Sequence, residues 1–84
     1  MKNQSIQGTY RHYKQHLYEV LGTVIHSESC EELVLYRSIN GSDEYPAGTL
    51  WARPYKMFFE TVLLDGKSVP RFEKMSNDVK TRSI

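Results

Sequence analysis

The stretch 59–72, FETVLLDGKSVPRF, gives the clearest structural signal in the sequence. Runs of β-branched and apolar residues flank the dipeptide Asp65-Gly66, which favours a type I′ turn because both turn positions need a positive φ. The stretch therefore predicts a hairpin of strands 59–64 and 67–72. Counting outward from the turn pairs Leu64 with Lys67, Val62 with Val69, Glu60 with Arg71 and Phe59 with Phe72.

The residues before this hairpin follow the same pattern of short apolar runs between polar turns. The runs predict strands over 8–13, 17–26, 32–39 and 49–53, with a loop over 40–48. Gly22, inside the second strand, predicts a bulge or sharp bend. Pro54 suits the first position of a helical turn that continues to residue 57.

These elements predict a mainly β fold. The preferred architecture is a small, partly open SH3-like barrel or roll of five to six short antiparallel strands with one short helical turn. A curved sheet with the helical turn on one face is the alternative. With 84 residues, 39% of them apolar, the chain has material for one thin core. We expect one domain over residues 8–75, with disordered termini at 1–7 and 76–84.

Charge and cysteine content exclude several classes of protein. A net charge of +1 gives no global field for nucleic acid or anionic lipid, so any such binding would have to be local. Cys30 is the only cysteine, which excludes an intramolecular disulfide and a thiolate-rich metal site. The opening residues contain no apolar segment of the signal-peptide kind, and no apolar run is long enough to cross a membrane. We expect a cytoplasmic protein.

No motif predicts a cofactor or a metal. The glycine-rich nucleotide loops and the serine-hydrolase elbow are both missing from the sequence. His12 and His16 lack the helical pattern of a zinc motif. His26, Glu28 and Cys30 alternate and could share a face, but the residues around them read as a solvated turn. A nucleophilic pair of Cys30 with His26 lacks any marked orienting group.

The most informative functional feature is the alternation of basic and aromatic residues. Between Tyr10 and Tyr18 the chain carries Arg11, Lys14, two histidines and no acid. Aromatic faces stack on bases or peptide side chains, and arginine forks hold phosphate or carboxylate. The candidate binding residues are Arg11, His12, Tyr13, His26, Glu28, Trp51, Arg53 and Arg71.

A purely structural interpretation competes with this one. Tyrosines and Trp51 can form the core with their polar tips at its rim. Arg71 can pair with Glu60 across the hairpin, and Arg53 can lie over an aromatic ring beside the core.

Three functions remain open. The first is a non-catalytic binding module that uses a basic-aromatic face for single-stranded nucleic acid or a peptide segment. The second is a small-molecule site or rudimentary enzyme, which requires His12, His26 and Glu28 to converge around a cavity. The third is a structural subunit that assembles through open strand edges.

Seven ordered blocks resemble a family of small bacterial proteins catalogued as domain of unknown function 1653. They are 10–14 (YRHYK), 18–22 (YEVLG), 26–28 (HSE), 34–37 (VLYR), 50–54 (LWARP), 57–58 (MF) and 65–72 (DGKSVPRF). The resemblance covers Gly8 to Met75 and implies an SH3-type barrel or roll in a bacterial cytoplasm, but it points to no particular activity. The family usually has glycine where this chain has Gln15, a position at which a positive φ would be awkward for glutamine.

Overall fold

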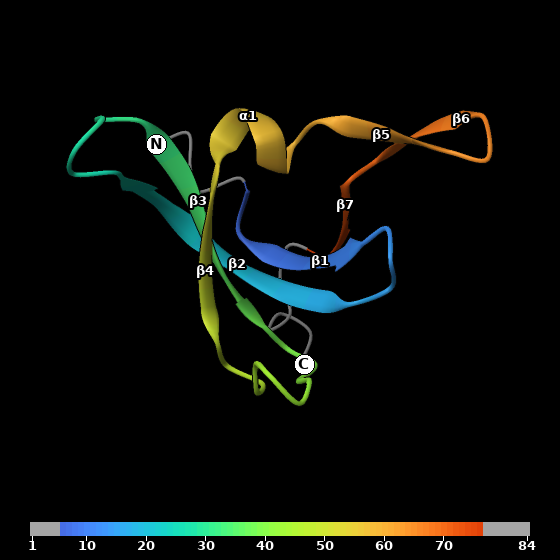
Figure 1. Ribbon diagram of the computed structural model, residues 1–84, viewed down its shortest axis with the longest axis horizontal. Helices are drawn as coiled ribbons and strands as arrows, with labels where there is room; N and C mark the ends of the chain where they lie inside the picture. The colour runs from blue at the N-terminus through green and yellow to red at the C-terminus, as the bar shows by residue number, and fades with distance from the viewer. Residues whose placement is uncertain (1–5, 77–84) are drawn as a thin grey trace.

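The computed structural model describes residues 6–76 of the chain, which form seven strands and one helical turn (Figure 1). The elements, in order, are β1 (Gly8–His12), β2 (Leu17–Ile25), β3 (Glu32–Ser38), β4 (Leu50–Pro54), α1 (Tyr55–Phe58), β5 (Thr61–Leu64), β6 (Lys67–Pro70) and β7 (Phe72–Ser76). The predicted mainly β fold with one short helical turn is confirmed.

The strands form two antiparallel sheets. Five strands pair in the order β4-β3-β2-β1-β7, while β5 and β6 pair only with each other as a hairpin. Within residues 6–76 the larger sheet does not close into a barrel, because the hairpin projects away instead of bridging β4 and β7 (Figure 1). The larger sheet is open, with the helical turn following β4, and the chain has seven strands where five to six were expected.

The β5–β6 hairpin confirms the prediction made from its turn. Asp65 and Gly66 have φ values of 54° and 80°, as a type I′ turn requires, and Val62 lies opposite Val69. The Arg71 backbone N–H donates to the Glu60 carbonyl at 3.0 Å, which extends the pairing to the base of the hairpin. The expected pairing of Phe59 with Phe72 is wrong, since Phe72 begins β7 and lies opposite His12 of β1.

The predicted irregularity at Gly22 is a β-bulge. Val20 lies opposite Tyr36, and the next paired residue, Gly22, lies opposite Leu35, so Leu21 is the extra residue of β2. The bulge shifts the alternation of side chains after it. Thr23, and not Gly22, therefore lies opposite the fully buried Val34, and Val24 is left exposed.

The core is largely aromatic. Phe58 of α1 stacks on Phe72 of β7 with ring centroids 4.0 Å apart, and the rings of Tyr10 and Tyr36 pack edge-on against Phe58. The hydroxyl of Tyr10 donates to the Ile6 carbonyl, so the polar tip of a buried tyrosine is paired. Ile6 is itself only 6% exposed, so core packing includes a residue that lies two positions before Gly8. The disorder expected at residues 1–7 and 76–84 falls largely outside the described residues, which are 6–76.

Candidate binding site

His12 lies at the end of β1, where the chain turns toward β2. Its Nδ1 accepts a hydrogen bond from the Lys14 backbone N–H at 3.1 Å, so the proton of the neutral ring is on Nε2. The ring packs against the edge of Phe72, with centroids 4.9 Å apart. Burial, and after it the charges of Arg53 and Arg71, lower the pKa of His12 to about 4. His12 is therefore a neutral hydrogen-bond donor at pH 7.

Arg53 reaches the same place from β4. Its guanidinium carbon is 5.8 Å from the centroid of Phe72, and its Nε donates a long hydrogen bond of 3.5 Å to the Tyr36 hydroxyl. None of the ion pairs among residues 6–76 includes Arg53, although its side chain is only half-exposed.

Arg71, between β6 and β7, is the third basic residue at this place, after His12 and Arg53. One of its terminal nitrogens forms an ion pair with Glu60. Its Nε is buried and has no hydrogen-bond partner among the described residues. We call His12, Arg53 and Arg71 the donor cluster.

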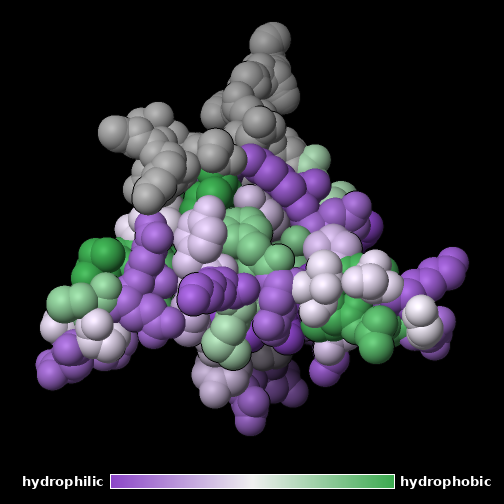
Figure 2. Space-filling view, turned by 90° about the horizontal axis from the view of Figure 1, so that it is seen from above, coloured by the Kyte–Doolittle hydropathy of each residue, from purple (hydrophilic) through white to green (hydrophobic). Residues whose placement is uncertain are grey.

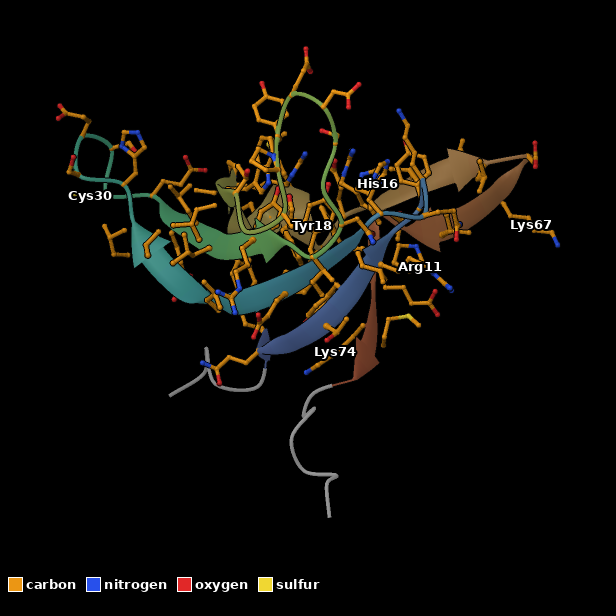
Figure 3. The ribbon with its side chains drawn as sticks, turned by 90° about the horizontal axis from the view of Figure 1, so that it is seen from below. Arg11, His16, Tyr18, Cys30, Lys67 and Lys74 are labelled. Atoms are coloured by element: carbon orange, nitrogen blue, oxygen red, sulfur yellow. The ribbon has the colours of Figure 1, made fainter. Side chains whose placement is uncertain are left out.

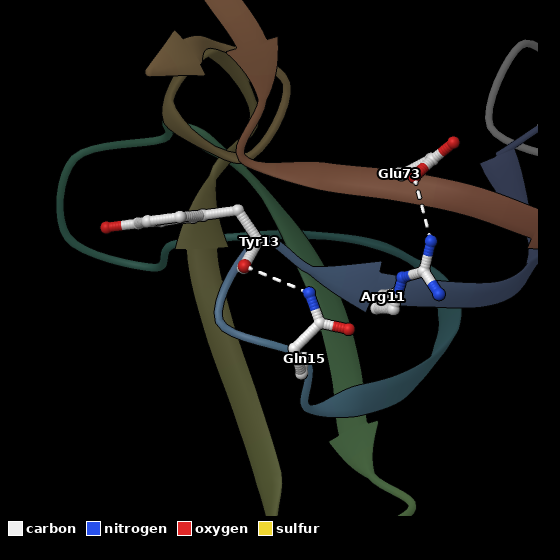
Figure 4. Close-up of polar contacts among 4 residues, drawn as sticks. All are labelled: Arg11, Tyr13, Gln15 and Glu73. Atoms are coloured by element: carbon white, nitrogen blue, oxygen red, sulfur yellow. Dashed lines mark hydrogen bonds and ion pairs between the residues drawn. The ribbon is translucent and has the colours of Figure 1, made fainter. Parts of the chain in front are cut away.

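A hollow of about 290 Å³ adjoins the donor cluster at His12. One wall is the β5–β6 hairpin, through Leu64, Val69 and Pro70, and the other is the end of β1 with Glu73 of β7. We call it the hairpin hollow. In this second wall the charges of Arg11 and Glu73 compensate each other, because Arg11 donates a hydrogen bond to Glu73 at 3.3 Å (Figure 4). The lining residues are Arg11, His12, Tyr13, Gln15, Leu64, Val69, Pro70 and Glu73.

Trp51 belongs to a different, smaller hollow of about 160 Å³ beside the 40–48 loop. Its indole N–H donates to the Ser38 hydroxyl at 2.9 Å, and its ring contacts Tyr45. This arrangement matches the structural interpretation of Trp51 as a core-flanking residue with a paired polar tip.

His26 and Glu28 do not reach the site. They lie in the turn between β2 and β3, which also carries Cys30, while Arg11, the neighbour of His12, lies opposite Leu17 at the other end of β2 (Figure 3). The nine residues of β2 separate the two ends by roughly 25 Å. His26 Nδ1 accepts hydrogen bonds from the backbone N–H groups of Glu28 and Ser29, so it stabilises its own turn. The convergence of His12, His26 and Glu28 that a catalytic centre would need is therefore not found.

No group of three or more histidine, cysteine or acidic side chains gathers to hold a metal ion in the described part of the chain. Likewise, no helix within it is long and apolar enough to cross a membrane.

The sequence prediction missed the residues that build the walls. The sequence places Leu64, Val69 and Pro70 in the hairpin, but only the docking of β7 beside β1 brings that hairpin to His12. Glu60 was expected to pair with Arg71, and this pair is confirmed. Glu73 directly follows the predicted hairpin in the sequence. Its place in the site could not be predicted, because the sequence did not indicate strand β7.

Comparison with known proteins finds one family. A family model described as "Protein of unknown function (DUF1653)" matches residues 8–74. A crystal structure described as a DUF1653 protein from Bordetella bronchiseptica has a TM-score of 0.75 and 29% sequence identity, covering 86% of this chain and 88% of that one. None of the curated proteins compared matches the chain.

Proposed function

This chain belongs to the DUF1653 family of proteins of unknown function, and on that premise we propose that it is a non-catalytic binding module for a peptide segment. The observation that carries the proposal is the hairpin hollow, which joins an apolar wall to paired charges and adjoins the donor cluster through His12, the one cluster residue that lines it. A peptide presents the same mixture of apolar side chains, backbone polar groups and isolated charges.

Single-stranded nucleic acid fits this surface less well. Binding of that kind uses a continuous basic groove with exposed aromatic faces for stacking. Here Arg11 and Arg71 are already paired with Glu73 and Glu60, and those carboxylates would repel phosphates. The ring of Tyr13 is half-buried and tilted against His12, so it offers little stacking surface.

Selection of random linear peptides displayed on phage, followed by NMR titration of the enriched peptides, tests this proposal. We expect those peptides to shift the amide signals of Tyr13, Leu64 and Val69, which line the hollow. Leu64→Asp is expected to weaken their binding at least ~10-fold, since a charge would replace part of the apolar wall.

Leu63→Asp is the matched control. Leu63 is the neighbouring residue of β5, is 78% exposed and does not line the hollow, because successive side chains of a strand point to opposite faces. Equal loss of binding in both variants would contradict the proposed surface. Salt-sensitive binding of oligo-dT or oligo-U, with no peptide enriched, would replace it with nucleic-acid binding.

A further inference from the structure

The donor cluster has more hydrogen-bond donors than acceptors. Arg53 presents its two terminal NH₂ groups, His12 presents Nε2–H, and Arg71 holds a buried Nε that has no acceptor among the described residues. Within residues 6–76 the only carboxylate paired with any of the three is that of Glu60, which binds Arg71. A buried donor without an acceptor costs free energy, so a site with this imbalance favours a group that brings acceptors.

The charges of the cluster match one negative charge. Arg53 and Arg71 contribute two positive charges, Glu60 contributes one negative charge, and His12 is neutral at pH 7. The remaining charge of +1 belongs to Arg53, whose planar fork can hold two oxygens of one group side by side.

We propose that Arg53, with His12 and Arg71 beside it, forms a subsite for a single carboxylate group of the ligand that occupies the hairpin hollow. This inference deepens the proposed function and rests on it for the statement that the carboxylate belongs to a peptide. The carboxylate comes either from the C-terminus of that peptide or from an aspartate or glutamate side chain.

A carboxylate fits the site better than a phosphate. Its single charge equals the charge left on the cluster, whereas a phosphate dianion would exceed that charge by one and be repelled about twice as strongly by Glu60. Phe72, the buried Tyr36 and the half-buried Tyr18 lie beside Arg53, and this aromatic surface lowers the hydration of the guanidinium and strengthens a charged pair.

The subsite is tested with two small probes that differ only in the carboxylate, N-acetyltyrosine and N-acetyltyrosinamide. We expect the acid to shift the side-chain Nε–Hε signal of Arg53 with a dissociation constant of about 1 mM, and the amide to bind at least ~10-fold more weakly. Inorganic phosphate is the third probe and is expected to bind more weakly than the acid. Equal shifts from acid and amide, or tighter binding of phosphate, would overturn the carboxylate assignment.

Variants separate recognition from folding. Arg53→Gln is expected to abolish the preference for the acid, and Arg53→Lys to reduce it, because lysine keeps the charge and loses the fork. Arg37→Gln is the matched control, since Arg37 pairs with Glu19 on an exposed part of the sheet. An Arg53→Gln protein with a native amide spectrum and an unchanged preference for the acid would refute the subsite.

The peptides enriched by phage display distinguish this inference from the proposed function. Each is compared with its C-terminal amide and with its Asp→Asn and Glu→Gln versions. The modified peptide whose affinity falls at least ~10-fold identifies the source of the carboxylate. Peptides that bind equally well in every form would leave the peptide-binding module standing and remove the carboxylate subsite.

Discussion

Gln15 has a φ of 80°, in the left-handed region that residues with a Cβ avoid. Its side chain donates only a weak 3.4 Å hydrogen bond to the Tyr13 carbonyl (Figure 4). Gln15→Gly is therefore expected to raise the free energy of unfolding by about 0.5–1 kcal/mol, after the entropy lost by glycine is deducted. Thermal unfolding should show an increase of roughly 4 °C in Tm.

Gln15→Ala controls for the lost hydrogen bond. Alanine removes the amide and keeps the Cβ, so its Tm should not exceed that of the wild type. If Gln15→Ala raises the Tm as much as Gln15→Gly does, then relief of backbone strain is not the cause of the increase.

His12 should make stability depend on pH. Its pKa is lowered to about 4 in the folded protein, against 6.5 for the unfolded chain, so the unfolded state binds the extra proton first. Stability is therefore expected to be greatest above pH 6.5 and to fall as pH decreases toward 4. Urea unfolding of the wild type and His12→Gln at pH 7 and pH 4.5 measures this, and the variant should lose less stability. Equal losses of stability in the wild type and in His12→Gln would contradict the lowered pKa of His12.

At the scale of elements, β7 closes the core through Phe72. This ring stacks on Phe58 and contacts Tyr18, Tyr36 and His12. Phe72→Ala is expected to lower the free energy of unfolding by about 3–5 kcal/mol, a large share of the roughly 4–13 kcal/mol available to a domain of this size. Met75→Ala, on the same strand but 48% exposed, should cost under about 1 kcal/mol. Comparable urea midpoints for the two variants would show that β7 is peripheral.

Elements encoded locally were predictable from the sequence. The Asp65-Gly66 turn and the Gly22 bulge were both anticipated, because φ requirements are carried by the residues themselves. β7 was not, because its residues FEKMS carry two adjacent charges and a strand there depends on pairing with β1.

The candidate site, like the fold, could be predicted from the sequence only in part. Arg53, Arg71 and His12 could be singled out by residue type, but their meeting around Phe72 depends on strand order. His26 and Glu28 were equally good candidates by residue type, but they lie at the other end of β2. The alternation of residues along a strand does not show how far they are from His12.

At the scale of the whole molecule, the β5–β6 hairpin is the part least supported by the rest. It pairs with no strand of the larger sheet, and its Leu63 is 78% exposed. Apolar surface is visible at the right-hand end of the molecule in Figure 2, where the hairpin lies. A two-stranded hairpin is marginally stable alone, so its amides should open locally without global unfolding. We expect the hydrogen-bonded amides of β5 and β6 to exchange at least ~100-fold faster than those of Val20 and Val34 in the core.

Because the hairpin forms one wall of the hairpin hollow, a bound peptide should slow this exchange. A ligand that contacts only the closed hairpin stabilises it by mass action, which gives about 2.7 kcal/mol at 100 times the dissociation constant and slows exchange by roughly 100-fold. Hydrogen exchange with and without an enriched peptide measures the effect, and the turn at 26–31 serves as an internal control. Protection at that turn but not at β5 and β6 would place the ligand at the wrong end of the sheet for the proposed module.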